Sequence, residues 1–79
     1  MIKTIEFEGH VFEYDAAEAK DYRNLKRVMK AAANPSGLFD AMEKIFAGKD
    51  EEYAEVLGGD FEKLGQLAGK VFEESMAKN

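Results

Sequence analysis

The longest segment with unbroken helical periodicity is Asp15–Ala33, DAAEAKDYRNLKRVMKAAA. Asp15 is a typical N-cap residue, and Glu18 three positions later completes a pattern like a capping box. At about 100° per residue, one side of this helix collects the apolar residues Tyr22, Leu25, Val28, Met29 and Ala32. We therefore expect one helix over residues 15–33 that buries this apolar stripe against the rest of the chain.

The other side of the same helix is basic, with Lys20, Arg23, Arg27 and Lys30 falling together. Residues 20–30 contain five basic residues and one acid, so this segment carries +4 and the remainder of the chain −9. Such a layout suits docking on an acidic protein or on the acidic half of a second copy. A solvated face balanced by acids of the same chain is the plainer interpretation, and both stay open. The net charge of −5 disfavours nucleic acid as a partner.

Residues 3–14, KTIEFEGHVFEY, precede this helix and predict a β-hairpin. The turn lies at Glu8-Gly9 or one residue later, and both registers keep the apolar residues on one face. The later turn would place two glutamates opposite each other, which is unfavourable. We expect the earlier turn, which places Ile5 opposite Phe12 and uses the positive φ that glycine allows.

Three more helices are expected after the break at Asn34-Pro35, over residues 35–47, 51–57 and 60–77. Asp50 and Asp60 precede the last two as caps. Gly65 and Gly69 each cost about 1 kcal/mol relative to Ala in a helix, which suggests a neighbouring backbone close by. The residues expected to face inward are Leu38, Phe39, Met42, Ile45, Phe46, Tyr53, Val56, Leu57, Phe61, Leu64, Leu67, Ala68, Val71 and Phe72.

At 79 residues, we expect a single domain over residues 1–79 of the α+β class, mostly helical. An N-terminal β-hairpin would pack on a bundle of three to four helices, because a two-stranded hairpin is not stable alone. The chain has no cysteine, which excludes disulfides and thiolate metal sites and fits a cytoplasmic location. It has no run of about 18 apolar residues, so no membrane association is expected.

No arrangement of residues indicates catalysis. His10 is the only histidine and falls at the expected hairpin turn, and Ser36 and Ser75 have no basic partner nearby in sequence. The acidic run from Asp50 to Asp60 lacks the ligand spacing of a calcium-binding loop. We therefore expect no catalytic, cofactor-binding or metal-binding residues, and no cofactor.

The chain resembles the small tail assembly chaperones of long-tailed bacteriophages and prophages. The resemblance rests on the opening KTIEFEGHVFEYD, a hairpin running into a capped helix, and on the segment GLFDAMEKIFAGKDEEYAEVLGGD. In the latter, a short apolar helix, a glycine turn, an acidic helix and a second glycine turn follow one another. The resemblance implies a non-enzymatic protein of the bacterial cytoplasm that binds the helical tape-measure protein and keeps it in solution during tail assembly.

A chaperone of this kind needs an apolar groove for its client and a net charge that keeps it in solution. The basic stripe would supply recognition, and the apolar side of the helix expected over residues 35–47 would supply grip. The expected protein-binding residues are Lys20, Arg23, Arg27, Lys30, Phe39, Met42 and Phe46, although the last three also suit a helix core. A homo-oligomer is a further possibility. The alternative function is a small acidic regulatory binder, such as an antitoxin or phage inhibitor, that blocks a basic host protein.

Overall fold

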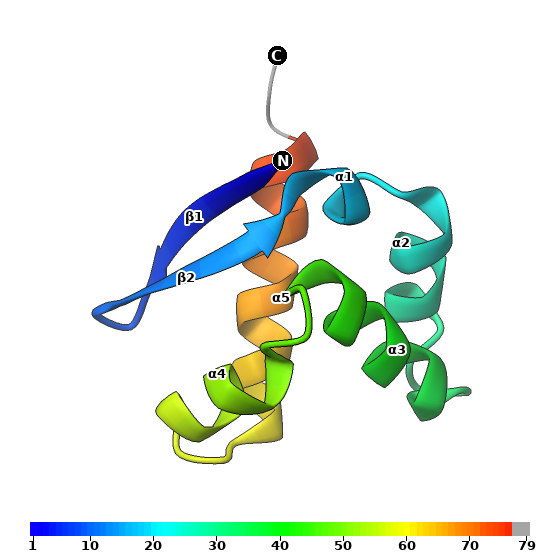
Figure 1. Ribbon diagram of the computed structural model, residues 1–79. Coiled ribbons are helices and arrows are strands. Elements are labelled where there is room, and N and C mark those ends of the chain that lie inside the picture. The colour runs from blue at the N-terminus through cyan, green and yellow to red at the C-terminus, as the bar shows by residue number, and fades with distance from the viewer. Residues whose placement is uncertain (77–79) are drawn as a thin grey trace.

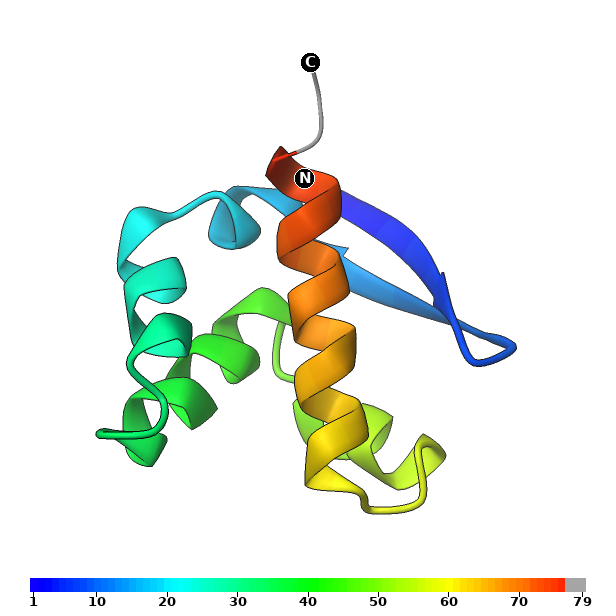
Figure 2. The same ribbon diagram turned by 180° about the vertical axis from the view of Figure 1, so that it is seen from behind.

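The chain folds into a β-hairpin followed by helices, as a computed structural model describes for residues 1–76 (Figure 1). The elements are β1 Ile2–Phe7, β2 His10–Asp15, α1 Ala16–Ala19, α2 Tyr22–Met29, α3 Pro35–Ile45, α4 Asp50–Val56 and α5 Phe61–Met76. The expected α+β, mostly helical class with an N-terminal hairpin is confirmed. In both ribbon views α5 lies in the middle, with the hairpin on one side and α2 and α3 on the other (Figures 1 and 2).

The hairpin has the register expected from the charges of its strands. Ile5 lies opposite Phe12, and the turn is at Glu8 and Gly9, whose φ angles are 52° and 81°. Two successive positive φ angles match the right-handed twist of the strands, which is why a glycine is favoured here. Phe12 is 2% exposed, so this face of the hairpin belongs to the core.

The prediction of a single helix over residues 15–33 is wrong, because the helix is interrupted between α1 and α2. Asp15 caps α1 as expected, its Oδ1 accepting hydrogen bonds from the N–H groups of Ala17 and Glu18 at 2.9 and 3.3 Å. Asp21 then acts as a second N-cap, with extended backbone and its Oδ1 2.8 Å from the N–H of Arg23. A short acidic side chain competes well for such free N–H groups, and it starts a new helix inside a helical sequence pattern.

The α2 helix also turns a different side to the core than its apolar residues indicate. Tyr22 and Met29 are 70% and 77% exposed, whereas Asn24 is only 1% exposed. Leu25 and Val28 lie half-buried at the edge of the core. The predicted apolar stripe is therefore largely outside, since the buried side of α2 is centred on Asn24.

The core lies between the hairpin and helices α3, α4 and α5. Its buried apolar residues are Ile5, Phe12, Tyr14, Ala16, Ala19, Leu38, Ala41, Met42, Ile45, Phe46, Tyr53, Leu57, Leu64, Leu67, Ala68, Val71 and Phe72. In the later helices, three more residues expected to face inward are exposed instead, namely Phe39 (52%), Val56 (46%) and Phe61 (55%). Each lies at the edge of the apolar side of its helix. At such an edge, helical spacing alone does not show whether a side chain is buried or exposed.

The helix ends and glycines show two further differences. Asp60 caps α5 as expected, accepting from the N–H groups of Glu62 and Lys63 at 2.9 and 3.3 Å. Asp50 is the first residue of α4 rather than its cap, and Lys49 takes the cap position. No close backbone approach exists at Gly65 or Gly69, because a Cβ at either position would meet nothing within 4 Å. The expected helix end at residue 77 lies outside the described residues.

Candidate protein-binding surface

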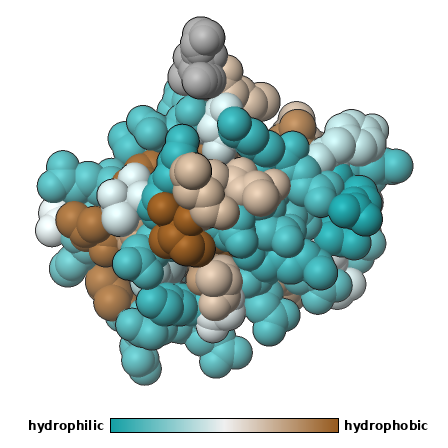
Figure 3. Space-filling view, turned by 45° about the horizontal axis from the view of Figure 1, so that its top comes forward, coloured by the Kyte–Doolittle hydropathy of each residue, from teal (hydrophilic) through white to brown (hydrophobic). Residues whose placement is uncertain are grey.

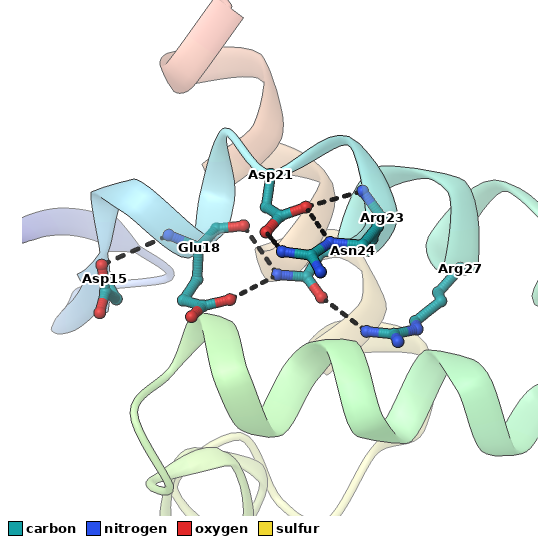
Figure 4. Close-up of polar contacts among 6 residues, drawn as sticks. All are labelled: Asp15, Glu18, Asp21, Arg23, Asn24 and Arg27. Atoms are coloured by element: carbon teal, nitrogen blue, oxygen red, sulfur yellow. Dashed lines mark hydrogen bonds and ion pairs between the residues drawn. The ribbon is translucent and has the colours of Figure 1, made fainter.

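The buried side chain of Asn24 holds the bend between α1 and α2 (Figure 4). Its Nδ2 donates to the carbonyl oxygen of Glu18 and to the Glu18 Oε1, both at 2.9 Å. Its Oδ1 accepts from the guanidinium of Arg27 at 3.1 Å. Because Glu18 is engaged here, its side chain serves the bend and not the expected capping box. These bonds set both the angle between the helices and the rotation of α2.

Asp21 and Arg23 form an ion pair on the outside of the same bend. The Arg23 Nε and Nη2 atoms donate to the two carboxylate oxygens of Asp21 at 3.1 and 2.8 Å. Hydrogen bonds from the Arg23 side chain and then its backbone lower the pKa of Asp21 from 3.8 to about 2. Asp21 therefore offsets much of the charge that Arg23 would offer to a partner.

An apolar and basic surface remains on the outer side of α2. Tyr22, Lys26 and Met29 are spaced by four and three residues, so they lie on one side of the helix, and all three are exposed. Lys30 follows at the C-cap and is also exposed. We call these four residues the α2 face. Neither lysine belongs to the ion pairs found among residues 1–76.

The predicted basic stripe is not continuous in the structure. Lys20 lies at the end of α1 and lines an open hollow of about 310 Å³ with Lys3 and Glu74, beside the C-terminal part of α5. Arg27 is half-buried, because its guanidinium contacts Asn24 and its side-chain carbons pack beside Gly37. Of the four residues, Arg23 remains exposed on α2 and Lys30 at its C-cap.

The apolar residues predicted to contact a partner do not form one surface either. Met42 and Phe46 are 1% and 0% exposed, so they belong to the core and offer no surface. The ring of Phe46 packs edge-on against Tyr53, with centroids 5.5 Å apart. Phe39 lies at the surface and is 52% exposed.

Phe39 forms a second surface together with Phe61 at the start of α5. Their rings pack edge-on with centroids 5.8 Å apart, and both are about half exposed. They line an open hollow of about 330 Å³ whose apolar floor includes Ala54 and Leu64 and whose rim includes Asp50 and Glu51. Residues 50–62 hold six acids and no lysine or arginine. We call the opening lined by Phe39, Phe61, Ala54, Leu64, Asp50 and Glu51 the acidic hollow.

On the side seen in Figure 3, hydrophobic residues form groups among hydrophilic ones. His10 is exposed at the hairpin turn, and within residues 1–76 no three His, Asp or Glu side chains gather as metal ligands. Among the helices of the same residues, none is both long and apolar enough to cross a bilayer.

Sequence reasoning did not include Tyr22, Lys26, Met29 or Phe61 among the candidate binding residues. A signal for the first three existed in Asp21, because a good N-cap inside a helical pattern permits a new helix with a new rotation. No sequence signal distinguished Phe61 from the core residues of α5, since it shares their spacing.

Comparison of the chain with known protein families, with characterised proteins and with solved structures gives no match.

Proposed function

We propose that this chain is a non-enzymatic phage or prophage tail assembly chaperone of the bacterial cytoplasm. It binds amphipathic helical segments of the tape-measure protein and keeps them in solution until the tail tube forms around them. The observation that carries the proposal is the α2 face, where Tyr22 and Met29 are more than two-thirds exposed beside Lys26 and Lys30.

The chemistry of this face suits a helical client with an apolar stripe and acidic flanks. Two exposed apolar side chains one helical repeat apart can pack against the apolar stripe of a second helix, as side chains do where two helices pack together. The lysines would pair with the acids that border the client stripe, and this gives orientation and speed of association more than affinity. The net charge of −5 keeps the complex in solution.

Co-expression with the tape-measure protein of the same phage genome tests the proposal. We expect the client to stay in the supernatant and to co-purify with the wild-type chain. Lys26→Glu with Lys30→Glu should weaken the complex by roughly tenfold or more, because the client acids then meet like charges. Tyr22→Ser with Met29→Ser should weaken it similarly through loss of apolar contact.

The matched control is Lys3→Glu with Lys70→Glu, which changes the net charge equally at exposed positions outside α2. This variant should bind the client as the wild type does. If the wild-type chain leaves the tape-measure protein insoluble, the proposal is wrong. Capture of a basic host protein that depends on Asp50 and Glu51 but not on Lys26 and Lys30 would favour the acidic regulatory binder instead.

A further inference from the structure

We propose that copies of this chain associate head to tail, with the α2 face of one copy seated in the acidic hollow of the next. In both surfaces, exposed apolar side chains lie beside a local excess of one charge. The α2 face lies in a segment of +4, over residues 20–30. The acidic hollow lies in a segment of −6, over residues 50–62. Complementary charge at this density outweighs the small net repulsion between two copies of charge −5 at low salt.

The shapes of the two surfaces are complementary as well. The α2 face is convex, because Tyr22 and Met29 project from the outer side of a helix that packs mainly on α3. The acidic hollow is concave, with the edge-on pair of Phe39 and Phe61 beside an opening of about 330 Å³. An aromatic ring or a methionine side chain packs favourably against such a pair. Lys26 and Lys30 would then meet Asp50 and Glu51 at the rim.

The two surfaces are built from different elements, so one copy can use both at once. The α2 face comes from a single helix, while the acidic hollow is formed by α3, α4 and the start of α5. An interface between two different surfaces leaves one of each free after every step and yields a ring or an open chain of copies. Self-association would also cover the α2 face, so a client for that face would have to displace the neighbouring copy.

Sedimentation or light scattering of the chain alone tests this inference without any client. At low salt we expect a mass above the monomer that rises with protein concentration, and a return to the monomer at high salt. Lys26→Glu with Lys30→Glu should raise the dissociation constant by roughly tenfold or more, and so should Asp50→Lys with Glu51→Lys. Lys3→Glu with Lys70→Glu again serves as the charge-matched control and should associate as the wild type does.

Mixing the two charge-reversed chains gives the sharpest test. Each repels itself, but in an equimolar mixture the reversed α2 face of one chain matches the reversed hollow of the other. The unchanged α2 face of the second chain also matches the unchanged hollow of the first, so the mixture should associate again. Phe61→Ser reports on the same hollow without changing charge and should also weaken association, and circular dichroism checks that every variant is folded. A wild-type monomer at all salt concentrations would overturn the inference, and so would association that survives Phe61→Ser and the reversal of Asp50 and Glu51 unchanged.

The outcome is distinguishable from that of the proposed function. A chain that binds its client but stays monomeric refutes head-to-tail association alone. A chain that associates but does not bind the client refutes the chaperone proposal alone.

Discussion

The hydroxyl group of Tyr53 accepts a hydrogen bond from the backbone N–H of Glu13 at 3.0 Å and so joins α4 to β2. The Tyr53 ring packs edge-on against Phe12 and Phe46, with centroids 4.8 and 5.5 Å away. One side chain of α4 therefore contacts both the hairpin and the C-cap residue of α3. It also covers an N–H group on the edge of β2 that does not face β1, and an unpaired edge group of this kind is otherwise available to other chains.

Tyr53→Phe should lower the free energy of unfolding by about 1 kcal/mol, because the Glu13 N–H loses its partner while the ring packing is kept. Urea unfolding followed by circular dichroism measures this difference. Tyr22→Phe is the matched control, since Tyr22 is 70% exposed, and it should leave the stability unchanged. Equal effects of the two substitutions would show that the Tyr53 hydroxyl contributes nothing particular.

Gly65→Ala and Gly69→Ala should each stabilise the chain by about 1 kcal/mol, because alanine is the better helix former and its Cβ meets no atom within 4 Å. For a domain of this size, each substitution should raise the melting temperature by about 4–8 °C. Calorimetry or thermal circular dichroism would measure the shift.

Gly48→Ala is the control for these two substitutions. A Cβ at Gly48 also meets nothing within 4 Å, but its φ is +82°, where an L-residue is strained. This variant should lose about 1–2 kcal/mol. A gain in stability at Gly48, or a loss at Gly65 and Gly69, would contradict the assignment of open space and backbone strain.

The sequence was sufficient for the elements whose signals are local. The register of the hairpin followed from avoiding opposed glutamates, and the caps Asp15 and Asp60 followed from residue type and position. The bend after α1 was not predicted, because it depends on a polar contact between Asn24 and Glu18 across the break. A prediction from helical periodicity treats asparagine as a polar surface residue. The buried side of α2 was therefore predicted from the wrong residues.

The candidate site was predicted only in part for the same reason. Because the buried side of α2 is centred on Asn24, Arg27 lies towards the core, and Tyr22 and Met29 lie on the outside. The exposure of Phe39 could not be read from its spacing either, since it depends on where α5 begins and on the ring of Phe61. The charge of the basic segment is a property of the sequence, but the residues that present it to solvent depend on tertiary structure.

Asn24→Ala should lower the free energy of unfolding by about 1–3 kcal/mol, because it removes buried hydrogen-bond partners of Glu18 and Arg27. Urea unfolding measures the loss. Asn34→Ala is the control, since Asn34 is exposed and its side chain accepts only an exposed hydrogen bond, from the Ser36 hydroxyl, so it should change the stability much less. If both variants lose the same amount, Asn24 does not hold the bend in the way that its contacts indicate.

The ion pair of Asp21 and Arg23 should make stability depend on pH in acid. The pKa of Asp21 is about 2 in the folded chain and 3.8 ordinarily, so the folded state binds this proton less readily than the unfolded state. The stabilisation is therefore fully present above about pH 4 and is lost as pH falls towards 2.

Asp21→Asn keeps a good N-cap but has no charge, which isolates the ion pair from the cap. Urea unfolding at pH 7, 4 and 2.5 should show the wild type more stable than Asp21→Asn at pH 7, with a difference that shrinks by pH 2.5. A difference between the two chains that stays constant over this range would exclude the ion pair as its source.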